Sequence, residues 1–167
     1  MAASTIIKNL NDGTITLSDG TGSPVTLVVP FSVGDLTISD LKQKQNETAR
    51  YETRGIFNVA RHTSRIYASG SFSFMIADYS DATNQTVLDF VRKQNSFSAN
   101  VSKYGSNADV YAIDIILTVE GTNHGDPSDH TLTIPYSECV MTLSEGDPNQ
   151  GTISFTTTAT AAEIAAV

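Results

Sequence analysis

Metal-ligating residue types gather once in this 167-residue chain, in a short polar segment. Two histidines and two aspartates fall within seven residues there: His124, Asp126, Asp129 and His130. Imidazole and carboxylate groups at this spacing could hold a divalent cation if the segment curled around it. The same composition is typical of a solvated loop, and no predicted strand or helix fixes the geometry of the ligands. We therefore expect neither a metal nor another cofactor.

The sequence contains no recognised catalytic constellation. No Gly-x-Ser-x-Gly, phosphate-binding loop, dinucleotide fingerprint or His-Glu-x-x-His pattern occurs. Two aspartate–glycine pairs, at 12–13 and 19–20, are typical of turns and lack the ligand ladder of a calcium loop. Cys139, the single cysteine, lies in a strand pattern beside no obvious base, and it excludes an intrachain disulfide. We expect a protein that is not an enzyme.

Composition limits the class of protein further. An apolar fraction of 40% and an aromatic fraction of 8% indicate one ordered domain, residues 1–167. The net charge of −8 argues against a groove that grips nucleic-acid phosphates, although not against a surface along which nucleic acid slides. Residues 1–10 lack the apolar core of a signal peptide, and no stretch reaches the ~20 apolar residues of a membrane span. We expect no membrane partner, and we expect the protein to reside in a reducing compartment or to be released from one.

The charged residues are segregated along the chain. Residues 105–167 contain nine acidic side chains and no Lys or Arg. Residues 42–65 invert the balance, with six basic side chains against Glu47 and Glu52. These six are Lys42, Lys44, Arg50, Arg54, Arg61 and Arg65. Copies with separate acidic and basic surfaces can pair head to tail into rings or filaments, although the fold could equally bring both segments together within one molecule.

The hydrophobic pattern predicts a largely antiparallel β domain of eight or nine strands. Polar and apolar residues alternate over 14–18, 35–41, 65–77, 111–120, 130–143 and 152–156. Alternation with period two indicates strands with one buried face. In the segment 65–77, Ser69, Ser71 and Ser73 lie opposite the apolar side chains. Pro135 cannot donate to a ladder, so it predicts an edge position or a bulge.

The remaining segments predict one short helix, a loop and a tail. Asp81 or Thr83 can cap the helix, whose apolar stripe is Val87, Leu88, Phe90 and Val91. Residues 43–50 are polar without apolar periodicity, which predicts a long mobile loop at the tip of a hairpin over 35–60. Residues 145–149 predict a tight turn, and the Ala-rich segment 158–167 predicts a C-terminal tail.

This order of elements resembles that of the major tail tube proteins of tailed bacteriophages. The resemblance rests on the loop-tipped hairpin, the serine-and-aromatic strand 69–74, the single helix, and the turn 144–148 that leads into 151–155. It spans residues 30–157, without a residue as diagnostic as a catalytic motif. The family shares its fold with the tubes of contractile injection systems and type VI secretion.

The resemblance implies an antiparallel β-sandwich or barrel-type domain that assembles into a ring with one continuous inter-subunit β-barrel. Hexameric rings would stack into a tail tube, whose acidic lumen conducts DNA during ejection without specific binding. The implied partners are further copies of the chain, tape-measure, baseplate or tail-tip and terminator proteins, and a sheath if the tail is contractile. The implied location is the tail of the virion, after assembly in the cytoplasm of the bacterial host.

Two sets of residues are predicted to serve this function. Asp114 and Glu120, on the polar face of a strand, are expected to line the lumen, with a plain solvent-facing position as the alternative. Contacts between rings and subunits are expected from the hairpin loop and its flanks: Lys42, Lys44, Glu47, Arg50 and Arg54. The alternative functions are the tube of a contractile injection system or bacteriocin particle, a β-sandwich adhesin or capsid decoration protein, and a lipocalin-type barrel.

Overall fold

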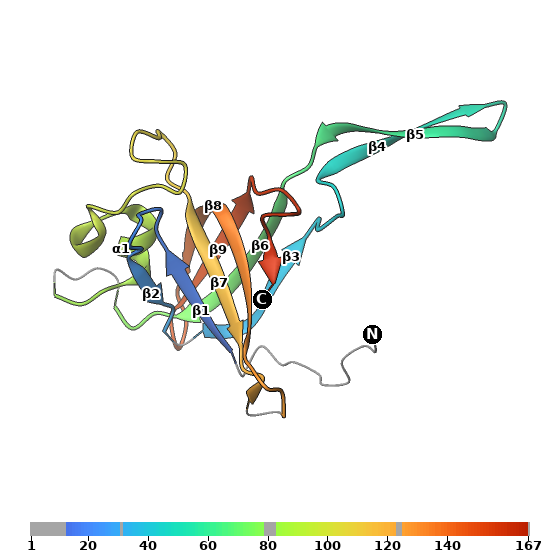
Figure 1. The fold of residues 1–167 in the computed structure, drawn as a ribbon. Coiled ribbons are helices and arrows are strands. Elements are labelled where there is room, and N and C mark those ends of the chain that lie inside the picture. The colour runs from blue at the N-terminus through green and yellow to red at the C-terminus, as the bar shows by residue number, and fades with distance from the viewer. Residues whose placement is uncertain (1–12, 31, 79–82, 123–124, 167) are drawn as a thin grey trace.

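The computed structural model describes residues 13–30, 32–78, 83–122 and 125–166, and only the backbone of 33–35 and 166 (Figure 1). It contains one α-helix, one 3-10 turn and ten strands within these residues. The first strands are β1 (Gly13–Ser18), β2 (Thr26–Val28), β3 (Ser32–Ser39), β4 (Asn46–Thr53), β5 (Ile56–Arg65) and β6 (Ala68–Met75). The helix α1 (Val87–Arg92) and the 3-10 turn (Asn95–Phe97) follow. The last strands are β7 (Ile113–Val119), β8 (His130–Ser144), β9 (Gln150–Thr157) and β10 (Ala165–Ala166).

Most strands belong to one antiparallel sheet with the order β2-β1-β7-β8-β9-β6-β3, and β10 pairs with β8. The strands β2 and β3 form the two edges of this sheet and do not pair with each other. The expected mainly β, antiparallel fold with one short helix is therefore confirmed, but the described residues do not close a barrel within one chain.

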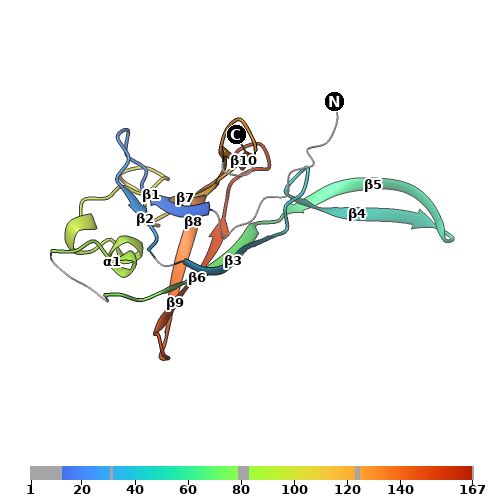
Figure 2. The ribbon, with the colours of Figure 1, turned by 90° about the horizontal axis from the view of Figure 1, so that it is seen from below.

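The twisted sheet encloses one hydrophobic core (Figure 2). Alternation puts the apolar side chains of β1, β6 and β9, and most of those of β7, on the inner face, as expected for 65–77. The buried core includes Leu17, Phe72, Phe74, Ile113, Ile115, Ile134, Ile153 and Phe155. The helix contributes Phe90, which is fully buried and packs edge-on against Phe97 with 4.8 Å between ring centroids. Both Figures 1 and 2 show α1 on the opposite side of the body from the β4–β5 hairpin.

Buried polar contacts fix the helix and the neighbouring loops. Thr86, rather than the predicted Thr83, caps α1: its hydroxyl accepts from the N–H of Asp89 at 3.1 Å. The other predicted cap, Asp81, lies outside the described residues. Asp19 is 1% exposed and accepts hydrogen bonds from the backbone of Thr21, Val25 and Val101 and from the Thr21 hydroxyl. Burial opposes its ionisation, but these four bonds outweigh burial and lower the pKa of Asp19.

The segment 43–50, predicted as a loop, forms a strand from residue 46 onward, so the prediction of a loop conformation there is wrong. Residues 46–53 form β4 and pair with β5, which makes a two-stranded hairpin that projects from the body (Figure 1). Arg54 and Gly55, with φ of 52° and 75°, form its tip. Every residue of β5 is exposed, so neither face shows the alternation that marks a half-buried strand.

Two further expectations concern β8 and the C-terminal end. Two residues of β8, Pro135 and Tyr136, oppose the single residue Asp114 of β7, because Ile113 pairs with Ser137 and Ile115 with Ile134. The bulge predicted from the proline is therefore confirmed. The C-terminal segment is not a loose tail throughout: after a turn it returns, and β10 pairs with Leu132 and Thr133 of β8.

Candidate functional site

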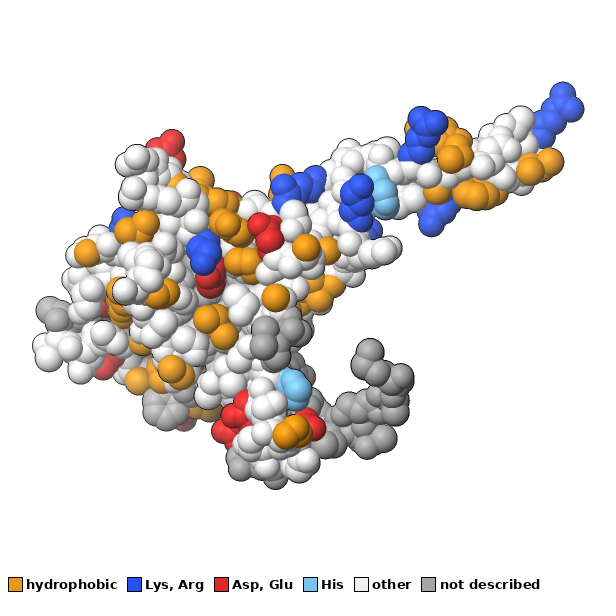
Figure 3. Space-filling model, in the orientation of Figure 1, with side chains coloured by type: hydrophobic (Ala, Val, Ile, Leu, Met, Phe, Trp, Pro, Cys, Tyr) orange, Lys and Arg blue, Asp and Glu red, His pale blue; other side chains and the backbone are white. Residues whose placement is uncertain are grey.

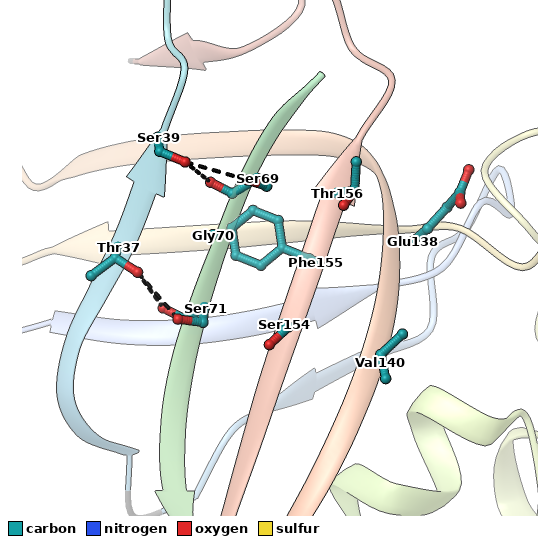
Figure 4. Close-up of a pocket in the computed structure, with 10 residues that line it drawn as sticks. All are labelled: Thr37, Ser39, Ser69, Gly70, Ser71, Glu138, Val140, Ser154, Phe155 and Thr156. Atoms are coloured by element: carbon teal, nitrogen blue, oxygen red, sulfur yellow. Dashed lines mark hydrogen bonds between the residues drawn. The ribbon is translucent and has the colours of Figure 1, made fainter. Parts of the chain in front are cut away.

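A hydroxyl-bearing face covers four neighbouring strands, β3, β6, β9 and β8 (Figure 4). The strand register aligns its side chains in three rows across the sheet. These rows are Ser39, Ser69, Thr156 and Glu138; Thr37, Ser71, Ser154 and Val140; and Ser73, Thr152 and Thr142. All of them are exposed or half-buried, while the alternating residues of the same strands point into the core. We call this surface the hydroxyl face.

Hydrogen bonds between strands order the hydroxyl face. Thr37 and Ser71 hydroxyls lie 3.2 Å apart, and Ser73 and Thr152 hydroxyls lie 2.9 Å apart. A hollow of about 420 Å³ opens on this face between β3 and β8 (Figure 4). The side chains of the three rows are mostly short and almost all neutral, so the face is polar and carries little charge.

Glu138 is the one ionisable side chain in these rows, and a tyrosine holds it. The phenol of Tyr104 donates to Glu138 Oε1 at 3.1 Å and shares a 2.6 Å hydrogen bond with the Thr158 hydroxyl. Burial raises the pKa of Tyr104; Thr158 opposes this shift and Glu138 adds to it. The phenol therefore stays protonated at neutral pH and remains a donor to the carboxylate. The Tyr104 ring stacks on Tyr136, with 5.5 Å between centroids.

The four-stranded part of the sheet that carries the hydroxyl face has two open edges. Among the described residues, strand β3 pairs only with β6. The second half of β8, residues 138–144, pairs only with β9 within the described part of the chain, because β7 and β10 contact its first half. The described part of the chain therefore leaves one side of each strand without a ladder partner. Successive strands alternate in direction, so β3 and β8 run opposite ways.

The projecting hairpin combines basic and apolar side chains. Arg50, Arg54 and Arg61 are exposed along it. Four exposed apolar side chains lie near its tip: Tyr51, Ile56, Phe57 and Val59. Side chains of this kind at the end of a projecting hairpin are typical of a contact surface rather than of a free one. The hairpin residues predicted for subunit contacts, including Lys44 and Glu47, are all exposed, as is Lys42 just before it.

The carboxylates outnumber the basic side chains on the body, away from the hairpin. Figure 3 shows basic side chains along the hairpin and acidic ones at the upper left, near the centre and on the loop at the bottom of the body. The turn 145–149 also lies far from the hairpin, because β6 begins next to the hairpin at Ala68 and ends at Met75, which pairs with Gln150. At ~3.3 Å per residue, β6 separates the two by roughly 25 Å. The basic residues of the hairpin and the carboxylates of the turn 145–149 are therefore separated in space, although Glu47 and Glu52 lie on the hairpin itself.

The two residues predicted to line the lumen, Asp114 and Glu120, are less exposed in the structure than a freely accessible channel wall requires. Asp114 lies on the outer face of β7, as the alternation predicts, but it is only 7% exposed. Lys103 folds over it, with Nζ 2.6 Å from Asp114 Oδ2, so its charge is neutralised within the chain. Glu120 follows the end of β7 and is half-buried. Neither residue belongs to the hydroxyl face.

The histidine- and aspartate-rich segment is organised by hydrogen bonds. Asp129 accepts from the backbone N–H groups of Gly121 and Thr122 and from the Thr122 hydroxyl, and these bonds lower its pKa. His130 lies 3.3 Å from Asp126. Among the described residues no group of three potential ligands converges, and His124 lies outside them. Burial raises the pKa of the Cys139 thiol to about 12, so it is protonated at neutral pH.

The sequence showed only part of the hydroxyl face. Ser69, Ser71 and Ser73 were visible as the polar side of one strand. The matching positions Thr152, Ser154 and Thr156 also alternate with apolar residues, but their place beside β6 depends on long-range pairing.

Comparison with known proteins adds no family. The sequence matches no protein-family model and no curated protein. In the described part of the chain, no helix is long and apolar enough to cross a membrane.

Proposed function

We propose that the chain is the structural subunit of a tube of the phage tail type, in which copies close into rings and rings stack. The observation that carries this proposal is the half-sheet β8-β9-β6-β3, with a continuous hydroxyl face and two open edges. Because it contains an even number of alternating strands, β8 of one copy meets β3 of the next in the antiparallel sense. The same pairing can repeat around a ring, with the hydroxyl face always on the same side.

Pairing between copies accounts for edges that the described residues of one copy leave unprotected. Isolated proteins blunt open edges with Lys, Pro or covering segments, since free N–H and C=O groups invite pairing. Residues 138–144 contain no Lys or Pro, and neither does β3. The pairing residues of both edges form a seam, β3 against the second half of β8.

The proposed channel wall is the hydroxyl face rather than Asp114 and Glu120. Six copies with four strands each would give a 24-strand barrel, and barrels of roughly 16–18 strands already enclose an aqueous channel. Short neutral hydroxyl groups offer a passing polyanion neither cations to bind it nor bulky side chains to obstruct it. The residual negative charge at Glu138 would repel phosphates weakly. DNA is thus the proposed cargo, which slides without specific contacts.

Disulfide cross-linking across the seam tests ring formation. In a Cys139→Ser background, Val140→Cys is combined with Thr37→Cys or with Ser39→Cys, all on the hydroxyl face. Oxidation at rising protein concentration should yield a ladder of cross-linked species that ends at one size, the closed ring, and electron microscopy should show that ring. Each single-cysteine variant is the control and should give no species above a dimer. A lack of higher species in both double variants would exclude the seam.

A further inference from the structure

A pocket of about 420 Å³ lies where the hairpin joins the body, and the ring seam makes no use of it. The ends of both hairpin strands, Asn46 and Arg65, line it together with Lys44 and Gln45, which precede β4. The other wall is the turn that precedes β10, from Thr160 to Ala162. The pocket therefore sits at the hairpin end of the sheet.

Gln45 leaves a hydrogen-bond donor unpaired in this wall. The side chain is 5% exposed, and its Oε1 accepts from the backbone N–H of Lys42 at 2.9 Å. That bond fixes which end of the amide carries the oxygen. The other end, Nε2, is buried and has no hydrogen-bond acceptor in the described part of the chain. Buried polar groups in folded proteins are nearly always paired, so this donor indicates an acceptor that arrives from outside the chain.

The charges around this amide favour a carboxylate as that acceptor. The Lys44 side chain is exposed and makes no ion pair within the described residues. The Arg65 guanidinium donates to the carbonyl of Thr158 and lies over the Tyr67 ring, which holds its positive charge at the pocket. Glu163 lies near enough to Arg65 for that cation to help lower its pKa, but its Oε2 is engaged mainly by the N–H and hydroxyl of Thr160, at 2.6 and 2.8 Å. Two cations and an amide donor form strong hydrogen bonds with a carboxylate.

From this geometry we propose that the pocket receives a carboxylate from the turn 145–149 of a second copy. Glu145 and Asp147 are exposed on that turn, and neither carboxylate has a partner in the described residues. The turn lies at the far end of β6 and β9 from the hairpin. A second copy displaced along these strands therefore brings its turn over the first copy's hairpin base. The contact joins opposite ends of the molecule, so it repeats without closing and builds a stack.

This inference rests on the proposed function in one respect, which is that the units that stack are rings. The seam cross-links measure the formation of rings separately from their stacking. A zero-length carbodiimide cross-linker joins an amine to a carboxylate that touches it. In a mixture of 14N- and 15N-labelled protein, we expect mixed-isotope peptides that link Lys44 to Glu145 or Asp147. The roughly 25 Å between these groups within one copy excludes the same link inside a chain.

Substitution of Gln45 tests the role of the amide. Gln45→Glu keeps the acceptor for Lys42 and supplies the pocket with its own carboxylate, so stacking should require at least about tenfold more protein. Gln94→Glu makes the same change in net charge at an exposed position next to α1 and should leave stacking unchanged. Glu145→Lys with Asp147→Lys should also weaken stacking, and combining both lysines with Gln45→Glu should restore part of it.

Each result decides between the proposals. Rings and stacks that form without the Lys44 cross-link would overturn the docking of the turn and leave the tube standing. Equal loss of stacking in Gln45→Glu and Gln94→Glu would also overturn it, because the effect would then be one of net charge. Absence of both the seam ladder and the stacks would remove the tube and the docking together.

Discussion

The seam between β8 and β3 can be tested with one surface substitution, Val140→Lys. Val140 is 67% exposed although it lies in the middle of a strand, on the open edge of the hydroxyl face. A lysine there should leave the monomer intact, since exposed positions of this kind change stability by within about 0.5 kcal/mol. The same lysine is a device by which natural edge strands prevent pairing.

The cost to assembly follows from the contacts that the seam would make. Residues 138–144 can form about seven ladder hydrogen bonds, each with a net contribution of about 1 kcal/mol, from which the cost of association is subtracted. Covering the exposed two thirds of Val140 would add about 1–2 kcal/mol. Loss of that term alone weakens each seam by about 5- to 30-fold. The effect compounds around a ring, because every subunit interface carries the substitution.

Sedimentation velocity across a concentration series measures the loss, and circular dichroism melting checks the monomer. Val28→Lys is the matched control: Val28 is 56% exposed on β2, the edge strand at the other end of the sheet, which lies outside the proposed seam. We expect Val140→Lys to shift ring formation to at least about fivefold higher concentration and Val28→Lys to leave it in place. Equal behaviour of the two variants would refute the assignment of β8 as a seam strand.

Three further perturbations address the wall, the loops and the core. Ser71→Lys adds a cation per copy to the proposed wall, so assembled tubes of this variant should bind a fluorescent oligonucleotide at low salt and release it at high salt. Wild-type tubes should not bind the oligonucleotide, and a variant that fails to bind it would place this face outside the channel. Asp19→Ala leaves three partly buried backbone N–H groups without their acceptor and should cost about 3 kcal/mol in urea unfolding, about 1 kcal/mol for each bond. Because the folded pKa of Asp19 is lowered, its contribution to stability is complete above about pH 4 and disappears as the pH falls through the folded pKa. The acid-induced loss of melting temperature should therefore be smaller in Asp19→Ala than in the wild type, and an unchanged pH profile would contradict this. Phe90→Ala removes the fully buried ring of α1 and should destabilise the fold by about 3–5 kcal/mol, and a cost below about 1 kcal/mol would show that α1 is not part of the core.

The strands with one buried face could be predicted from the sequence, because burial of one face produces a local alternation of polar and apolar residues. This holds for β6, where Phe72 and Phe74 point inward between outward serines. It fails for β4, since both faces of the hairpin are exposed and no apolar period exists to detect. The hairpin forms from the pairing of two sequence-adjacent strands, and polar residues such as Asn46 and Thr48 do not prevent it.

The candidate site depended on contacts that alternation cannot reveal. The polar side of β7 was predicted correctly, but the burial of Asp114 depends on Lys103, which a separate loop brings over the strand. The hydroxyl face requires the pairing of Ser71 with both Thr37 and Ser154, positions 34 and 83 residues away. The charge segregation was predictable because it is a property of the chain, although its separation onto opposite ends needed the direction of β6.

Salt should separate the two directions of assembly, because the two contacts rest on different forces. The seam joins backbone ladders and includes Val140, and these interactions depend little on ionic strength. The stacking contact pairs Lys44 and Arg65 with exposed carboxylates, which salt screens over about 10 Å at 0.1 M. Raising the salt from about 0.01 to 0.5 M should therefore convert stacks into separate rings, visible by electron microscopy and as a drop in sedimentation coefficient. Stacks that persist while rings come apart would reverse the assignment of the two contacts.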